Sequence, residues 1–256
     1  MIGLGEIVPA DVRQSAITSQ SIGVVELETL MKVVPLGSRV EAYERAIVDD
    51  NVLGLKTSTA REWRFKTLRR LYRLNHETVL FRAMSDLWPF DSEAHPLLAA
   101  LCAAAHDTVF RATADVIRAT SVGDEVTLDD LIPPIESAFP GAYQPGTLET
   151  IGAKAYASWG QTGHLGEPAA GRRLRMRANC KPAAVAFAVL LGHLEGHRGE
   201  ALFETLWAAL LDRPRSHLYD LAFAASQQGM LEFRNAGGVV EVGFQELLRP
   251  IEGQLL

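Results

Sequence analysis

Apolar residues along this chain recur mostly at intervals of three and four, which is the spacing of amphipathic helices, and seldom alternate as they do in strands. In the first half this spacing predicts four helices: Val24–Val33, Arg39–Val48, Ala60–Leu74 and Glu77–Leu87. A longer helix is expected over Leu97–Ala119, opened by His95-Pro96. It is apolar on most of its circumference and should therefore lie at the centre of the fold.

Proline and glycine are densest between residues 121 and 146, where a short helix is expected around Leu128–Ile132. We interpret residues 121–146 as a connection between an N-terminal helical domain, residues 1–120, and a C-terminal domain, residues 147–256.

The C-terminal domain is expected to begin with a helix that Thr147 caps and Gly160 ends. Three further helices are predicted at Pro182–Leu194, Glu200–Leu211 and Ser216–Gln228. A β-hairpin follows, with strands Leu231–Arg234 and Val239–Phe244 around the turn Asn235-Ala236-Gly237-Gly238. Three helices closed by a hairpin is the order of a winged helix. We therefore predict a mainly α fold of two helical lobes, the second ending in a winged-helix-like module with a C-terminal β-hairpin.

The composition excludes several classes of protein. The chain has 256 residues, 48% of them hydrophobic and 22% charged, so it is not disordered and can bury a large core. Its two cysteines, Cys102 and Cys180, form no metal or disulfide framework and are expected to be buried and reduced. The first residues lack the basic start and apolar run of a signal peptide, so none is expected, and the apolar runs are shorter than the ~20 residues that span a bilayer. A cytoplasmic protein without membrane contact is the expectation.

Positive charge is concentrated between Lys56 and Leu74, although the formal net charge of the protein is −6. Seven basic residues stand there against one acid, Glu62, which is expected to form a capping box with Thr59. At 100° per residue, one arc of the predicted helix is apolar and a separate arc is basic. The apolar arc comprises Trp63, Phe65, Thr67, Leu68, Leu71 and Tyr72, and the basic arc comprises Lys66, Arg69, Arg70 and Arg73.

Like charges at this spacing repel one another, and a bound polyanion that neutralises them is one explanation of the basic arc. The alternative is a solvated face that is paired with acids elsewhere in the fold.

A second basic cluster lies at Gly171–Lys181, where Arg173, Arg175 and Arg177 alternate with Leu174 and Met176. This alternation predicts an extended segment with one charged face, suited to phosphate contacts. The alternative is an arginine-rich surface loop paired with acids. The candidate nucleic-acid-binding residues are thus Lys56, Arg61, Lys66, Arg69, Arg70, Arg73, Arg172, Arg173, Arg175, Arg177 and, at the hairpin turn, Arg234.

No catalytic constellation stands out. His193 and His197 have the i, i+4 spacing of a metal-chelating pair, but no third ligand is evident, and two histidines at a helix end are the favoured interpretation. Asp129-Asp130 is expected to cap a helix rather than to act as an acid–base pair. Neither a GxSxG elbow nor a phosphate-binding GxxxxGK[ST] loop is present. We expect a protein that is not an enzyme and has no cofactor.

Two segments resemble the BrxA family of bacterial BREX phage-exclusion systems. The first contains Asn51-Val52-Leu53, Ser58-Thr59-Ala60-Arg61 and the Leu-Arg-Arg-Leu of residues 68–71. The second is Thr147–Leu165, with its lysine four residues after Thr150 and its Gly-x-Leu ending. Together they cover less than a quarter of the chain. The resemblance implies an all-α, two-lobed protein without enzymatic activity that binds DNA and works with other BREX components.

The patches and the resemblance together predict a protein that binds double-stranded DNA through its backbone, with little sequence preference. Two patches on one face could clamp a duplex, whereas patches on opposite faces could not. The alternative function is a protein-interaction module that docks its basic helix on an acidic partner subunit. Nothing in the sequence indicates the oligomeric state.

Overall fold

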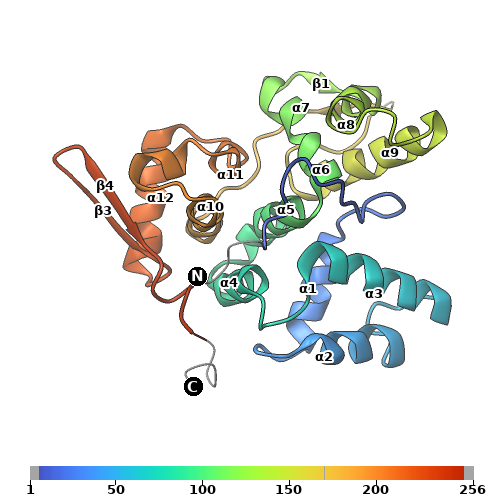
Figure 1. Ribbon diagram of the computed structural model, residues 1–256, viewed down its shortest axis with the longest axis horizontal. Helices are drawn as coiled ribbons and strands as arrows, with labels where there is room; N and C mark the ends of the chain where they lie inside the picture. The colour runs from blue at the N-terminus through green and yellow to red at the C-terminus, as the bar shows by residue number, and fades with distance from the viewer. Residues whose placement is uncertain (1–5, 170, 251–256) are drawn as a thin grey trace.

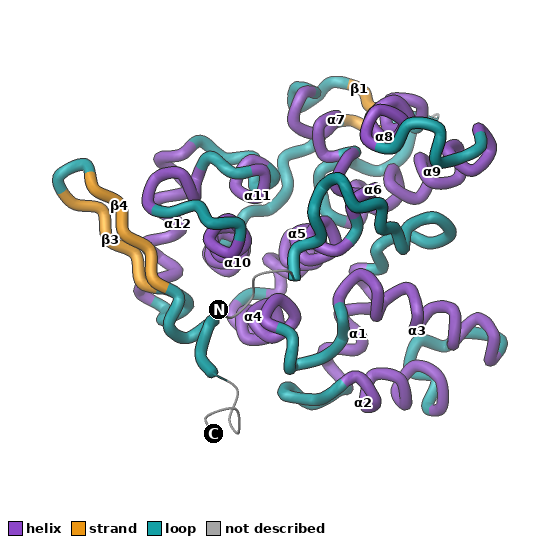
Figure 2. Tube along the Cα trace, viewed as in Figure 1, coloured by secondary structure: helices purple, strands orange, loops and turns teal. Residues whose placement is uncertain are grey.

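The computed structural model describes residues 6–169 and 171–250, which fold mainly into helices (Figure 1). The strands of these ranges form two small sheets, each an antiparallel pair of strands (Figure 2). The predicted mainly α fold with a C-terminal hairpin is confirmed. No helix of the described ranges combines the length and the apolar character that a membrane span requires.

The first third of the chain forms helices close to those predicted. They are α1 (Val24–Val33), α2 (Val40–Glu44), a π-helical turn η1 (Arg45–Asp49), α3 (Ser58–Tyr72), α4 (Val79–Leu87) and the 3-10 turns η2 (Trp88–Phe90) and η3 (Ser92–Ala94). The predicted capping box is wrong, because the N-cap of α3 is Thr57, whose side chain accepts a hydrogen bond from the backbone N–H of Ala60 at 3.1 Å. Thr57 has extended backbone angles, and Thr59 already lies inside the helix.

The long apolar stretch forms three helices instead of the expected one: α5 (His95–His106), α6 (Thr108–Ala112) and α7 (Ala114–Ala119). The break falls at Asp107, which leaves the helical conformation and becomes the N-cap of α6. Its buried carboxylate accepts hydrogen bonds from the backbone N–H groups of Phe110, Ala16 and Ile17, at 2.8, 2.5 and 3.1 Å. A carboxylate that satisfies several backbone donors favours this break over a continuous helix.

The middle of the chain is the most irregular. Its elements are β1 (Glu125–Val126), the 3-10 turn η4 (Asp129–Leu131), α8 (Ile132–Ala138), α9 (Pro145–Gln161) and β2 (Arg173–Leu174), which pairs with β1. Helix α9 begins two residues before the predicted Thr147 and ends one residue after Gly160. Asp130 accepts hydrogen bonds from the N–H and hydroxyl of Thr127, both at 2.7 Å, and so stabilises the turn that leads into α8.

The last third has the element order of a winged helix. It comprises α10 (Pro182–Leu194), the 3-10 turn η5 (Gly199–Phe203), α11 (Leu206–Ala209), α12 (Arg215–Gln227), β3 (Glu232–Ala236) and β4 (Val239–Gly243). The predicted helix Glu200–Leu211 is divided at Thr205, which is the N-cap of α11. Gly237 and Gly238 form the hairpin turn with φ of 59° and 81°, the left-handed angles that a two-residue type I′ turn requires. The expected four-residue turn is therefore two residues shorter, since Asn235 and Ala236 belong to β3.

Helices α5 and α10 form the centre of the molecule and pack against each other. Nearly all of their residues are buried, which explains why the sequence of both is apolar around the whole helix. Helix α3 packs on the other side of α5, while α11 and α12 pack on α10 and the hairpin packs on α12 and η5 (Figure 1). Cys102 and Cys180 are buried free thiols, as expected.

The division into domains 1–120 and 147–256 stays a prediction. The buried apolar residues form one continuous cluster that includes members from both ranges. Helix α9, placed in the second domain by the sequence, is hydrogen-bonded to residues 22–24 of the first.

Candidate anion-binding site

Helix α3 places four cations along one face: Lys66, Arg69, Arg70 and, at its end, Arg73. Lys66, Arg69 and Arg70 are exposed, and Arg73 is half-buried. Within residues 6–169 and 171–250, no carboxylate lies within ion-pair distance of any of the four, and their side chains donate no hydrogen bond to protein. The contrast is strong with Arg39, Arg118, Arg172 and Arg249, each of which is paired with an acid.

These four cations line a single surface hollow of about 600 Å³, which we call the cationic hollow. Its other lining residues are Ala16, Thr18, Ser19, Val40, Trp63, Thr67, Asn75 and Thr78. None of the described residues that line it is acidic. Because field lines are focused between low-dielectric walls, a concave surface of one sign attracts counter-ions more strongly than the same charges on a flat face.

A second hollow, of about 490 Å³, adjoins the first. The two share Thr18, Arg70 and Arg73, and the second adds Arg13 and Tyr143. The Arg13 guanidinium lies 5.4 Å from the centroid of the Tyr143 ring, in a cation–π contact. The sequence analysis missed both residues, because they lie far from α3 in the chain and neither belongs to a basic run.

The end of α3 has an unusual backbone that positions Arg73. Arg73 and Leu74 have φ of 64° and 50°, in the region that glycine normally occupies at a helix C-terminus. Leu74 is fully buried, and the imidazole Nδ1 of His106 lies 2.8 Å from the carbonyl oxygen of Leu71 in the last turn. Burial, reinforced by the positive charge of Arg73, lowers the pKa of His106 to about 4, so the imidazole is neutral near pH 7 and donates from Nδ1.

The segment of residues 14–24 forms one wall of the cationic hollow, through Ala16, Thr18 and Ser19, and is fixed at both ends. At its start, the Asp107 carboxylate accepts hydrogen bonds from the backbone N–H groups of Ala16 and Ile17. The Thr108 hydroxyl accepts one from the backbone N–H of Gln14 at 2.9 Å. Burial raises the pKa of Asp107, and the hydrogen bonds from Phe110, Ala16 and Ile17 act against that rise.

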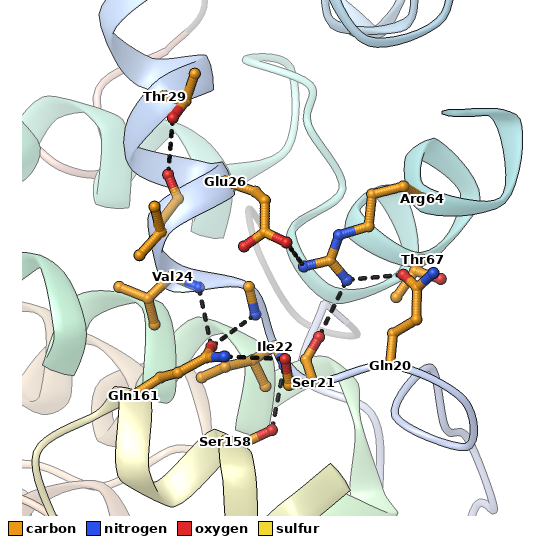
Figure 3. Close-up of polar contacts among 12 residues, drawn as sticks. Gln20, Ser21, Ile22, Val24, Glu26, Thr29, Arg64, Thr67, Ser158 and Gln161 are labelled. Carbon is orange, nitrogen blue, oxygen red and sulfur yellow. Dashed lines mark hydrogen bonds and ion pairs between the residues drawn. The ribbon is translucent and has the colours of Figure 1, made fainter. Parts of the chain in front are cut away.

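At its other end the segment is held by Arg64, as Figure 3 shows. The guanidinium donates to Gln20 Oε1 at 2.8 Å, to the carbonyl oxygen of Ser21 at 3.1 Å and to Glu26 Oε1 at 2.8 Å. Gly23, with φ of 72°, leaves the space that the guanidinium occupies, since a Cβ at this position would lie 1.8 Å from Nη2 of Arg64. The wall is therefore rigidly connected to α3 itself.

Helix α9 supports the same segment from the other side. The Gln161 Oε1 atom accepts from the backbone N–H groups of Gly23 and Val24 at 3.0 and 3.2 Å, and Ser158 Oγ accepts from that of Ile22 at 3.2 Å (Figure 3). Residues 20–24 thus connect α3, through Arg64, with α9, through Ser158 and Gln161.

The assignment of residues to the two arcs of α3 needs one correction, at Trp63, and one addition, because Arg64 was assigned to neither arc. Trp63, expected on the apolar arc, is 53% exposed and lines the cationic hollow. Arg64 is buried at 5% exposure and belongs to the packed side, because Gln20, Ser21 and Glu26 compensate its charge there. Local periodicity alone does not reveal which contacts a neighbouring segment offers.

Two other predicted site residues on this stretch do not line the hollow. The Arg61 guanidinium is half-buried and donates to the carbonyl oxygen of Val48 at 2.6 Å, which attaches α3 to the end of η1. Lys56 is exposed in the loop that precedes the helix. The structure therefore brings together Lys66, Arg69, Arg70 and Arg73 and leaves these two outside.

The predicted charged face of the second basic cluster is wrong. Leu174 and Met176 are 49% and 46% exposed, whereas Arg175 is 3% exposed and forms an ion pair with Asp212 at 3.0 Å. Burial lowers the pKa of Arg175, and the adjacent Asp212 opposes that change. Asp212 also lies 3.8 Å from Arg177.

The neighbouring arginines are compensated as well. Arg172 is paired with Glu125 at 2.7 Å, and Arg173 donates to the carbonyl oxygen of Gly166 and lies over the Tyr156 ring. The alternative interpretation, an arginine-rich segment paired with acids, describes this cluster. Three of its arginines, Arg172, Arg175 and Arg177, have an acidic partner within the chain.

Arg234 is exposed on β3, directly opposite Glu241 in the register of the hairpin. Figure 1 shows the hairpin at the left end of the long axis and α3 at the right. Arg234 lines neither the cationic hollow nor the adjoining one, so it does not extend this patch.

The histidine pair lies at the end of a helix, as the favoured interpretation expects. Helix α10 ends at Leu194, so His197 lies beyond it, and the His193 ring packs against Phe244 with centroids 4.7 Å apart. Among the described residues, no group of three or more potential ligands is arranged to hold a metal ion.

Neither a protein-family model nor a curated protein sequence matches this chain.

Proposed function

We propose that this protein binds double-stranded DNA through phosphate contacts in the cationic hollow, without catalysing a reaction on it. The observation that carries the proposal is the hollow itself, with four cations and no acid among its described lining residues. In a protein of net charge −6, leaving four cations unneutralised at one concave site is unfavourable unless an anion binds there. Phosphates need positive charge and donors, which arginine and lysine supply.

We further propose that the protein is an accessory component of a bacterial phage-defence system of the BREX type, working with other proteins of that system. This part rests on the resemblance of residues 51–71 and 147–165 to the BrxA family. The first of these segments contains α3 and its arginines, and the second supports the wall of the cationic hollow through Ser158 and Gln161.

Fluorescence anisotropy of a labelled duplex, titrated with protein at two salt concentrations, tests the proposal. Neutralising four phosphates predicts a slope of log K against log salt of about −3.6, or a loss of roughly 100-fold in affinity between about 50 and 200 mM salt. The variant Lys66→Glu/Arg69→Glu/Arg70→Glu should lose this binding while its circular dichroism stays unchanged.

The chain offers a matched control in Arg172→Glu/Arg177→Glu/Arg234→Glu. It changes the net charge by the same amount at three exposed arginines outside the hollow, and it should retain salt-dependent binding. Equal losses in both triple variants would show that net charge alone controls binding. The proposal would be overturned if the wild-type protein did not bind the duplex but co-purified with an acidic protein after nuclease treatment. That result would favour a protein partner.

A further inference from the structure

Trp63 is a large aromatic side chain left exposed among cations. The chain has four tryptophans, and the other three, Trp88, Trp159 and Trp207, are at most 7% exposed, against 53% for Trp63. The indole Nε1 donates to Ser19 Oγ at 3.2 Å, and both residues line the cationic hollow. This hydrogen bond fixes the orientation of the ring while leaving much of its surface in solvent.

The residues around the hollow combine an aromatic surface with positive charge in the way that single-stranded nucleic acids require. Trp63 lines the cationic hollow, Tyr143 lines the adjoining one, and Arg70 and Arg73 line both. Aromatic rings bind unpaired bases by stacking on their π faces, and neighbouring cations bind the phosphates of the same nucleotides. The volume of about 600 Å³ lies in the range of sites for small organic ligands.

We propose that the cationic hollow holds one unpaired nucleotide, with its base stacked on Trp63 and its phosphate bound by Arg70 and Arg73. This inference rests on the proposed function for its phosphate contacts and adds a base contact to it. Bases inside an intact duplex are stacked on one another, so the ligand is a nucleotide without a partner. Such a nucleotide is supplied either by a single-stranded segment or by a free mononucleotide.

The exposed position of Trp63 gives a direct assay, since its fluorescence should respond to a stacked base while the three buried tryptophans should not. Oligo(dT) should quench the exposed component of the emission, and an abasic oligonucleotide of equal length should not. Trp63→Ala should weaken oligo(dT) binding by about tenfold. Trp63→Phe keeps an aromatic ring and should retain most of the affinity, although its fluorescence signal disappears. Trp63→Ala should weaken oligo(dT) binding more than it weakens duplex binding, because an intact duplex offers no unpaired base to stack on the ring.

The two sources are distinguished by thymidine monophosphate. If thymidine monophosphate displaces oligo(dT) at a concentration similar to that of the oligonucleotide, the ligand is a free nucleotide. If it does not displace oligo(dT), the ligand is a single strand.

Oligo(dT) binding that is equal in wild type and folded Trp63→Ala would overturn the inference and leave the duplex proposal intact. Conversely, a wild-type protein that binds oligo(dT) but no duplex would overturn the proposed function and leave the base contact standing.

Discussion

Arg64 and Arg69 lie on the same helix, but replacing each by methionine should affect a different property, stability for Arg64 and DNA binding for Arg69. The Arg64 guanidinium is buried and makes three hydrogen bonds, to Gln20, Ser21 and Glu26. Arg69 is exposed, and within the described ranges its side chain makes no hydrogen bond or ion pair to protein. We expect Arg64→Met to reduce the free energy of unfolding and Arg69→Met to reduce only binding.

The magnitude for Arg64 follows from its contacts. A hydrogen bond to a charged group contributes about 1.5–3 kcal/mol in mutational studies. The contact with Glu26 contributes less free energy than that, because the Glu26 side chain is 37% exposed and solvent screens the interaction. Methionine recovers part of the apolar packing. We therefore expect Arg64→Met to lower the free energy of unfolding by roughly 2–4 kcal/mol, whereas Arg69→Met should stay within about 0.5 kcal/mol of wild type.

Urea unfolding followed by circular dichroism measures the first effect. With m of about 2–3 kcal/mol per molar urea, the midpoint of Arg64→Met should fall by roughly 1 M. Duplex binding at a temperature where both variants are folded measures the second effect, and Arg69→Met should make the salt slope shallower by about 0.9. An unchanged midpoint for Arg64→Met would refute the role of this network in holding the wall. A slope that changes equally in both variants would refute the separation of the two arginines.

Three further outcomes are expected. Gly23→Ala should destabilise the fold by about 1–3 kcal/mol in thermal unfolding, since φ is 72° and the new Cβ would collide with Arg64; a wild-type midpoint would contradict that geometry. Arg73→Gly should leave stability within about 1 kcal/mol of wild type, because glycine removes strain at φ of 64° but adds freedom to the unfolded chain, while duplex binding weakens. Burial lowers the pKa values of His106 and His164 to about 4. Between that value and the unfolded pKa near 6.5 the unfolded state binds more protons, so stability should fall by about 1.4 kcal/mol per pH unit for each histidine as pH drops through this window. Replacing either histidine by asparagine should flatten the measured slope.

Apolar periodicity located most helices of this chain, and the reason is local. Helices α1, α4 and α10 lie where the three-to-four residue spacing places them, to within two residues, and the two glycines of the hairpin identify its turn. Periodicity failed at Asp107, because the donors that end α5 there come from Ala16 and Ile17, about 90 residues away in the chain. A carboxylate in an apolar helix shows in the sequence, but its partners do not.

The candidate site shows the same division. Local spacing determined that Lys66, Arg69, Arg70 and Arg73 share one face of α3, since that depends only on the pitch of a helix. Tertiary structure decided the rest. It buried Arg64 against the segment of residues 20–26, exposed Trp63, brought Tyr143 beside Arg70 and Arg73, and neutralised Arg175 with Asp212. A charge is buried or left free according to the acceptors that distant segments bring to it, and those are set by packing rather than by sequence neighbours.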